Sequence, residues 1–287
     1  MSQEVVLRVA AIEVDVQIGA VDLNVRRAAD AVQRGVRHGA RLVVLPELTT
    51  SGYVFRDVAE AMSAAMTRSD DRLSAIAAEV PADSVAVVGF LEKAAGSLFN
   101  SALVFSGGTV IGGYRKSHLW GREAEIFTPG TSAGTVIETP LGHLGVAICY
   151  DNEFPEVPRG LALAGADLLA LPVNWPMVAR PKGEHPPEMI QAMGSARSSR
   201  LPTVIADRHG QERDVEWTGG TAVIDGDGWI AARPRDRMAV ADLRIRPGDK
   251  RLPPWNDLFD DRRPDLYEAL SSAGGGEAAP ERPPHAL

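Results

Sequence analysis

The sequence predicts an α/β protein of alternating strands and helices, on three observations. Short apolar runs of strand type recur along the chain, amphipathic segments separate several of them, and no repeat or linker divides the chain before about residue 271. A hydrophobic content of 45% is typical of a globular protein with a large buried core. We therefore expect one domain over residues 1–270, followed by a disordered tail rich in Ala, Gly and Pro over 271–287.

The first part of the chain opens with a strand, a helix and a second strand. Residues 5–12 and 42–45 are rich in the β-branched and leucine side chains that strands favour. Between them, residues 21–38 have the apolar spacing of an amphipathic helix that ends near Gly39. The next predicted elements are a helix over 70–79 and strands over 84–91, 99–105 and 109–115.

The second part continues the alternation. A hairpin is predicted to join residues 135–138 to 144–148 around a Pro-Leu-Gly turn, and the Asp-Gly-Asp-Gly sequence 225–228 is a turn between the last two strands. The other elements are helices over 155–164 and 185–199 and strands over 168–171, 203–206, 219–224 and 229–232.

Composition argues against several classes of partner. The chain has 30 Lys and Arg against 38 Asp and Glu, and a net charge of −8 disfavours binding to nucleic acid or to an acidic membrane. No apolar stretch approaches the roughly 20 residues of a membrane span. The start Met1-Ser2-Gln3-Glu4 lacks the pattern of a secretory signal, so we expect a cytoplasmic protein.

Cys149 is the single cysteine, which excludes an intramolecular disulfide. It follows the apolar run 145–148 and precedes cap-forming residues and Pro155, a pattern typical of a strand that turns sharply into a helix. A nucleophile on such a turn projects from the backbone with free N–H groups beside it. The alternative is a cysteine that serves only as a small buried apolar side chain.

Two more reactive residues follow predicted strands. Glu47 comes after the strand 42–45, and Lys116 comes after the strand 109–115. Ligands bind at the carboxyl edge of the strands in α/β sheets. The sequence therefore predicts that Glu47, Lys116 and Cys149 meet at such an edge, although either charged residue alone would be an ordinary surface group.

The residues around these positions form four motifs in order. They are Leu45-Pro46-Glu47-Leu48, Tyr114-Arg115-Lys116-Ser117-His118-Leu119, Glu123 with Phe127-Thr128-Pro129-Gly130, and Ile148-Cys149-Tyr150-Asp151 with Phe154-Pro155-Glu156. With them, the chain resembles the nitrilase superfamily of carbon–nitrogen hydrolases over roughly residues 5–270, in its amidase-like branch. The resemblance implies an α-β-β-α sandwich of four layers, a homodimer or higher even oligomer, and catalysis without a metal or organic cofactor.

The resemblance also implies a Glu-Lys-Cys triad. Cys149 attacks the substrate carbonyl, Glu47 acts as general base, and Lys116 stabilises the oxyanion together with the N–H of Tyr150. A second glutamate of the family, matched here by Glu123, positions the lysine and the substrate.

Family position makes Tyr53, Tyr150 and Trp175 candidates for the substrate pocket. Aromatic packing in the core or at the rim explains Tyr53 and Trp175 nearly as well. Glu125 lies two residues from Glu123 and is an alternative match to the family's second glutamate.

These implications favour a thiol hydrolase that cleaves a small carboxamide to a carboxylic acid and ammonia through a thioester. The alternatives are a nitrilase or N-carbamoyl amide hydrolase with the same triad, and a non-catalytic binding member of the fold. Two departures weaken any transfer of substrate identity. Ser199-Arg200 stands where many relatives carry Glu-Asn, and Asp207 stands where they carry Asn.

Overall fold

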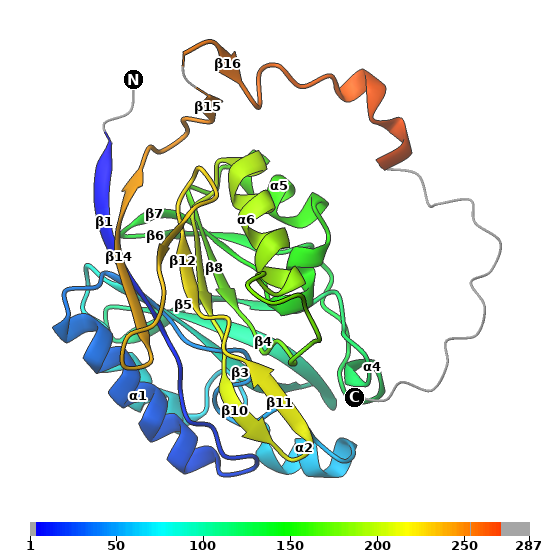
Figure 1. Ribbon diagram of the computed structural model, residues 1–287. Coiled ribbons are helices and arrows are strands. Elements are labelled where there is room, and N and C mark those ends of the chain that lie inside the picture. Colours follow the sequence, from blue (N-terminus) through cyan, green and yellow to red (C-terminus); the bar gives the residue numbers. More distant parts are fainter. Residues whose placement is uncertain (1–3, 253, 271–287) are drawn as a thin grey trace.

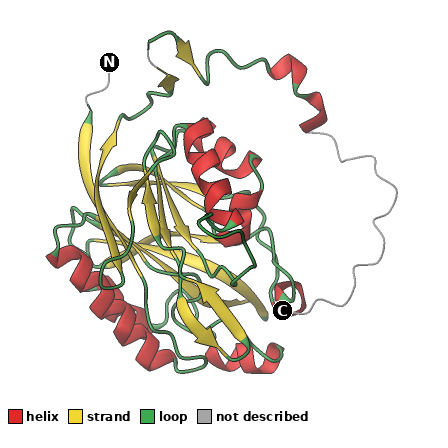
Figure 2. Ribbon diagram, in the orientation of Figure 1, coloured by secondary structure: helices red, strands yellow, loops and turns green. Residues whose placement is uncertain are grey.

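Two six-stranded sheets face each other in the computed structural model, which describes residues 4–252 and 254–270 (Figure 1). Helices cover the outer faces of the pair, so the layers run α-β-β-α (Figure 2). This arrangement confirms the predicted sandwich. None of the helices in the described part has the length and apolar character needed to cross a lipid bilayer.

The first sheet has the strand order β14-β1-β2-β3-β4-β5. Its strands are β1 (Val5–Ile12), β2 (Leu42–Val44), β3 (Val85–Ala94), β4 (Ser97–Ser106), β5 (Thr109–Arg115) and β14 (Met238–Ile245). β1, β2 and β3 are parallel, and β4 pairs antiparallel with both β3 and β5. β2 and β5 therefore run in the same direction and end at the same edge.

The second sheet has the order β13-β12-β9-β8-β7-β6. Its strands are β6 (Thr135–Thr139), β7 (Gly142–Val146), β8 (Leu168–Pro172), β9 (Thr203–Ala206), β12 (Ala222–Ile224) and β13 (Ile230–Ala232). The adjacent strands β7, β8 and β9 are parallel, so the loops that follow them emerge side by side.

The helices differ greatly in length. They are α1 (Val21–Arg37), α2 (Val58–Ala64), α3 (Ser74–Ala77), α4 (Glu123–Ile126), α5 (Glu156–Leu163) and α6 (Pro187–Ser199), with short 3₁₀ turns η1 (Asp71–Leu73), η2 (Cys149–Glu153), η3 (Pro264–Leu266) and η4 (Glu268–Leu270). α1 buries Val25, Ala28 and Val32 on one face, at helical spacing, against the outer face of the first sheet.

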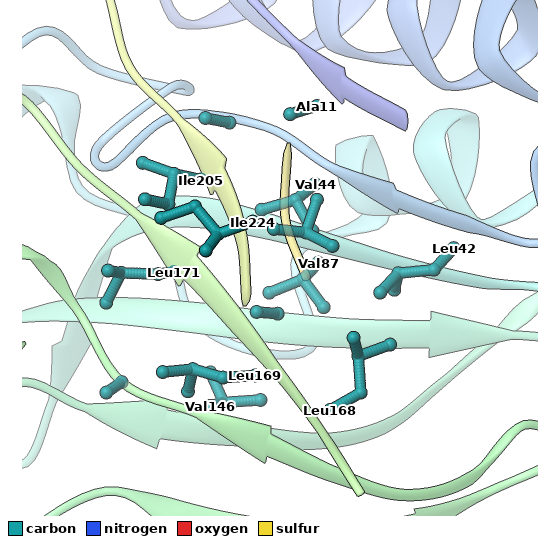
Figure 3. Close-up of a cluster of buried hydrophobic side chains, with 14 of the residues drawn as sticks. Ala11, Leu42, Val44, Val87, Val146, Leu168, Leu169, Leu171, Ile205 and Ile224 are labelled. Atoms are coloured by element: carbon teal, nitrogen blue, oxygen red, sulfur yellow. The ribbon is translucent and has the colours of Figure 1, made fainter. Parts of the chain in front are cut away.

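The core between the sheets depends on strand alternation. Leu42 and Val44 of β2 point into the space between the sheets, whereas Val43 points outward under α1. In Figure 3, Val44 and Val87 of the first sheet lie close to Ile224 of the second. Burial of this apolar layer fixes the distance between the two sheets, and with it the distance between the loops at their edges.

Several elements differ from the sequence predictions. The helix expected over 70–79 is the turn η1 followed by the four-residue α3, and the strand expected over 219–224 begins only at Ala222 because Gly219 has a φ of +65°. The sequence analysis missed α2, β14, the hairpin of β10 (His209–Glu212) and β11 (Val215–Thr218), and the short pair β15 (Arg251–Leu252) and β16 (Asn256–Asp257). The tail predicted over 271–287 lies outside the described residues.

The segment after β14 leaves the sandwich and runs past the ends of α5 and α6 (Figure 1). The guanidinium of Arg159 lies 4.9 Å from the ring centre of Phe259, which attaches the segment to α5. Elsewhere in this segment, three apolar side chains are largely exposed: Trp255 by 88%, Leu266 by 66% and Leu270 by 68%.

Candidate active site

The loops that follow the parallel strands of both sheets carry the predicted site residues. Glu47 follows β2 and Lys116 follows β5 in the first sheet, and Cys149 follows β7 in the second. The backbone N–H of Glu47 lies 3.4 Å from the carbonyl oxygen of Val173, and the side-chain amide of Asn174 donates to the carbonyl of Glu47 at 2.9 Å. These bonds join the end of β2 to the end of β8.

Cys149 begins the 3₁₀ turn η2 with a φ of +49°, a conformation that costs energy for any residue other than glycine. The carboxylate of Asp151 stabilises this turn. It accepts hydrogen bonds from the N–H of Ile148 at 3.0 Å and the hydroxyl of Tyr114 at 2.9 Å, and Nδ1 of His118 lies 2.8 Å away. Asp151 and His118 therefore support the turn that carries Cys149.

A buried charged cluster lies in the first sheet. The Nζ of Lys116 is 2.8 Å from Oε1 of Glu47 and 2.8 Å from Oε2 of Glu123. Asn100, inside β4, donates its side-chain amide to Oε1 of Glu47 at 2.7 Å and to Oε1 of Glu123 at 3.1 Å. The other oxygen of Glu47, Oε2, is buried without a hydrogen-bond partner. It is the acceptor that remains available to a proton.

Burial sets the protonation of this cluster. It raises the pKa of Glu47 to about 7, although Lys116 opposes the shift. Burial lowers the pKa of Lys116, but Glu123 and Glu47 together raise it well above its ordinary value, so the side chain is an ammonium. Burial and then the charge of Glu47 raise the pKa of the Cys149 thiol. The resting thiol is therefore neutral, and a base must take its proton during attack.

Gly89 of β3 determines where Glu47 lies. A Cβ atom at Gly89 would come within 2.6 Å of the Cα of Glu47 and of the backbone nitrogen of Leu48. Only glycine lets the strand approach the loop this closely. Leu48 itself has a φ of +48° and is fully buried, so the loop after β2 is constrained on both sides of the carboxylate.

The three aromatic candidates have different surroundings. Tyr53 is 8% exposed and packs edge-on against Trp217 at 5.5 Å; burial, followed by the charges of Glu123, Glu47 and Cys149, raises its pKa well above the ordinary value. Tyr53 is therefore a neighbour of the charged cluster.

Trp175 and Tyr150 differ in burial. Trp175 is 2% exposed, and its ring packs against Gly220, where a Cβ would come within 2.5 Å. Tyr150 is half-buried between the rings of Trp120, at 4.9 Å, and Phe154, at 5.1 Å. Trp175 thus has the packing of a core residue, whereas Tyr150 lies at the rim of the site.

The two departures from the family pattern have structural explanations. Asp207 is fully buried after β9 and accepts N–H groups from Trp175 at 3.0 Å, Arg208 at 2.8 Å and Gly220 at 2.7 Å. Burial raises its pKa to about 8. Arg200 ends α6 in the left-handed region and donates to the carbonyl of Gly226 at 2.8 Å. Both residues support loops rather than the charged cluster itself.

Sequence reasoning missed Asn100 and Asn174. Asn100 interrupts an apolar strand and is 1% exposed, so a polar residue within that run was an available signal. Asn174 lies in a Pro-rich loop without periodicity and gave no such signal. Within residues 4–252 and 254–270, no group of three or more His, Cys, Asp or Glu side chains could bind a metal ion.

Known proteins resemble this chain over nearly its whole length. A sequence model described as "Carbon-nitrogen hydrolase" matches residues 8–245. A protein named "Nitrilase" from Pyrococcus abyssi is 33% identical over 267 residues, covering 91% of this chain and 99% of its own. An N-carbamoylputrescine amidase from Arabidopsis thaliana is 28% identical over 280 residues, covering 89% and 92%. The crystal structure of an amidase from Nesterenkonia sp. superposes with a TM-score of 0.74 at 25% identity, covering 92% of this chain and 96% of that one.

Proposed function

Because the chain belongs to the carbon–nitrogen hydrolase family and is a hydrolase of carbon–nitrogen bonds, we propose that it cleaves a small carboxamide to a carboxylic acid and ammonia. One observation carries the proposal: a buried ammonium, Lys116, bonded to two carboxylates, Glu47 and Glu123, in the charged surroundings of Cys149. Buried charges in the surroundings of a thiol, with a carboxylate whose pKa is raised to about 7, are typical of a catalytic site.

In the first half-reaction, Sγ of Cys149 forms a bond to the amide carbonyl carbon. Glu47 takes the thiol proton as the bond forms and transfers it to the nitrogen, which leaves as ammonia. The carbonyl oxygen gains negative charge and is stabilised by Nζ of Lys116 and the N–H of Tyr150. Removal of one such donor typically costs 10²–10³ in kcat.

In the second half-reaction, a water molecule attacks the thioester carbonyl. Glu47 accepts the proton of that water, the carbon–sulfur bond breaks, and the proton returns to the sulfur of Cys149 as the acid product forms. A pKa of about 7 suits Glu47 to both directions of proton transfer near neutral pH. Glu123 fixes the position of Lys116 throughout, because its Oε2 lies 2.8 Å from Nζ.

We assign Tyr53, Tyr150 and Trp175 to the walls of the substrate site, Tyr150 at its rim and the other two at its buried end. The charges of Glu123 and Glu47 near Tyr53 and the contact of Tyr150 with Trp120 support the assignment of the two tyrosines. For Trp175 the support is its neighbour Asn174, whose amide is bonded to the backbone of Glu47. We also propose a cytoplasmic homodimer. The exposed apolar side chains of the segment after β14, such as Trp255, support a partner surface, and light scattering of the purified protein tests it.

Hydrolysis of an N-carbamoyl amine by the same residues is the second candidate. The similarity to an N-carbamoylputrescine amidase and to a citrullinase from Francisella tularensis supports it, and the similarity to the protein named "Nitrilase" supports nitrile hydrolysis as a third candidate. A ureido substrate would release carbon dioxide together with ammonia, which separates the two reactions.

The test is ammonia release from short amides, N-carbamoyl amines and nitriles, beside the Cys149→Ala variant. We expect release from amides without carbon dioxide, and a loss of at least about 10³-fold in the variant. Release from nitriles but not from amides would contradict the amidase. Release that persists in Cys149→Ala would contradict the thioester mechanism.

A further inference from the structure

A second group of charged side chains lies beside β5, apart from the catalytic cluster. Arg115 directly precedes Lys116, and successive side chains of a strand point to opposite faces. The guanidinium of Arg115 bonds to Glu92 of β3 through Nε at 3.1 Å and Nη2 at 2.5 Å. Arg68, in the segment after α2, bonds to the same carboxylate through Nε at 2.9 Å and Nη2 at 3.0 Å. Two cations therefore share one buried anion.

The charge of this group is not balanced. Burial raises the pKa of Glu92, but the two guanidinium groups and the hydroxyl of Ser101 lower it to about 2, so the carboxylate stays ionised near neutral pH. No other carboxylate of the described residues is bonded to Arg68 or Arg115. One negative charge thus stands against two positive ones, and the group has a surplus positive charge.

Both arginines line a cavity of about 360 Å³ at β5, the edge strand of the first sheet. The segment that leads into β6 lines the same cavity with the hydroxyl groups of Thr131, Ser132 and Thr135. Among the described residues, none is bonded to any of these hydroxyls, and the described residues that line the cavity include no carboxylate. The cavity therefore combines surplus positive charge with unused hydrogen-bond donors.

The guanidinium groups are held in place with part of each still free. Because both bond to Glu92 through Nε and Nη2, their Nη1 atoms have no partner among the described residues. Nη1 of Arg68 lies 3.5 Å from the position that a Cβ of residue 113 would take, so Gly113 leaves the space beside it open. Cζ of Arg115 lies 3.8 Å from the ring centre of Phe99, which fixes its plane. Donors that are fixed before binding lower the entropic cost of holding a ligand.

A second cavity shows that arginines alone do not mark such a site. A cavity of about 280 Å³ beside β14 is lined by four arginines, but also by six carboxylates. Three of those carboxylates, Glu4, Asp227 and Asp249, are bonded to the arginines. Its cations are therefore compensated by the protein itself, whereas those of the cavity at β5 are not.

We propose that Arg68 and Arg115, with the hydroxyl groups of Thr131 and Ser132, bind a tetrahedral oxyanion, with phosphate as the ligand. Arginine binds phosphate through paired, charge-assisted hydrogen bonds. A tetrahedral anion directs its oxygens to several sides and can meet both guanidinium groups and the hydroxyls, whereas the oxygens of a carboxylate lie in one plane. The site is separate from the proposed hydrolysis, because Lys116 bonds to Glu47 rather than to Glu92.

The first experiment is titration calorimetry with inorganic phosphate and with acetate at pH 8, at equal and low ionic strength. We expect a Kd of about 1 mM or lower for phosphate, and binding of acetate at least about tenfold weaker. Arg68→Met should weaken phosphate binding at least about tenfold. Arg72→Met is the matched control that should keep it, because Arg72 is also 42% exposed and bonds to Asp70 through Nε and Nη2. Phosphate that binds no better than acetate, or equally well to Arg68→Met, overturns the proposal.

A second variant tests the hydroxyl groups without touching the ion pairs. Thr131→Ala combined with Ser132→Ala changes two exposed side chains that bond to no other described residue, so the fold should be unaffected. We expect about three- to tenfold weaker binding of phosphate. In thermal unfolding, phosphate should raise the Tm of the wild type more than that of this variant at the same concentration. Equal affinity and an equal rise in Tm would contradict a site between β5 and this segment.

Discussion

The two sheets contribute different kinds of groups to the site. The first sheet supplies the charged ones, with Lys116 bonded to Glu47 and Glu123 and with Asn100 bonded to both carboxylates. The second sheet supplies the neutral thiol of Cys149, on the turn η2 that follows β7. The acid–base groups and the nucleophile thus belong to separate layers.

This difference shows what inter-sheet packing does for the chemistry. The charged cluster is complete within one sheet, so its geometry does not depend on the cysteine. Hydrogen bonds tie the layers together near the site: Val173 and Asn174 bond to the backbone of Glu47, and Tyr114 and His118 bond to Asp151. These bonds and the apolar core between the sheets together set the distance over which a proton moves from Cys149 to Glu47.

The strongest way to disrupt the first sheet's contribution is Lys116→Met. The change leaves Glu47 and Glu123 buried without a cation, so we expect about 3–5 kcal/mol less stability at pH 8 and at least about 10³-fold lower kcat/KM. The stability loss should shrink at pH 5, where protonation of the carboxylates removes their repulsion. Denaturant unfolding and ammonia release measure both quantities.

A matched variant separates charge from packing. Adding Glu123→Gln to Lys116→Met should restore part of the stability without restoring activity. If Lys116→Met alone is as stable as the wild type at pH 8, the buried ion cluster does not have the electrostatics described here.

The next largest effect is expected from Glu47→Gln, which keeps shape and removes the base. We expect about 10²–10⁴-fold lower kcat/KM. In the wild type, kcat/KM should rise with pH up to about 7, because the base must be ionised.

Over the pH range in which ionisation of Glu47 raises kcat/KM, it should lower the free energy of unfolding. Its pKa is raised from 4.5 to about 7, so its favourable contribution is complete below pH 4.5 and is lost as the pH rises to 7. Unfolding free energies at pH 5, 6, 7 and 8 should show this fall in the wild type and a smaller fall in Glu47→Gln. Parallel curves for the two proteins would contradict the raised pKa.

Gly89→Ala tests how the first sheet fixes the carboxylate. The added Cβ would push on the backbone of Glu47 and Leu48, so we expect about 1–3 kcal/mol of destabilisation and about tenfold lower kcat with little change in KM. Gly160→Ala is the control, since Gly160 lies in α5 with open space around it, and alanine there should stabilise the helix by about 0.5–1 kcal/mol. Equal behaviour of the two variants would show that the close approach at Gly89 is unimportant.

The smallest effect is expected in the second sheet, from Asp207→Asn. The pKa of Asp207 is raised from 3.8 to about 8, so its contribution to stability is complete below pH 3.8 and lost as the pH rises to 8. The variant should therefore resemble the wild type most closely near pH 4 and become progressively more stable than it up to about pH 8, with activity within about tenfold. A variant that instead weakens as the pH rises would indicate that the N–H groups of Trp175, Arg208 and Gly220 keep the carboxylate ionised.

The sequence predicted the elements whose signal is local. The strand over 203–206 was predicted with the bounds it has, and α1 and α6 were predicted to within two residues, because apolar periodicity and proline mark them. β14 was missed although Met238–Ile245 is apolar at alternate positions. Its partner is β1, more than 200 residues away, and no pattern within a window reports such a pairing.

The site residues also fall into two groups, those marked by a local sequence signal and those whose contacts depend on long-range packing. The positions of Glu47, Lys116 and Cys149 at strand ends followed from short apolar runs and from motif order. The contacts of Asn100 and Asn174 depend on which side chains meet across the sheets, and that is decided by register and packing.

The buried cluster around Lys116 also bears on product release. Above about pH 7, where Glu47 and Glu123 are both ionised, the cluster carries one more negative charge than positive. An amide enters this field uncharged, but the acid formed from it ionises and is repelled by two fixed carboxylates facing a single ammonium. The field therefore weakens binding of the product relative to the substrate, and product inhibition should become weaker as the pH rises above 7.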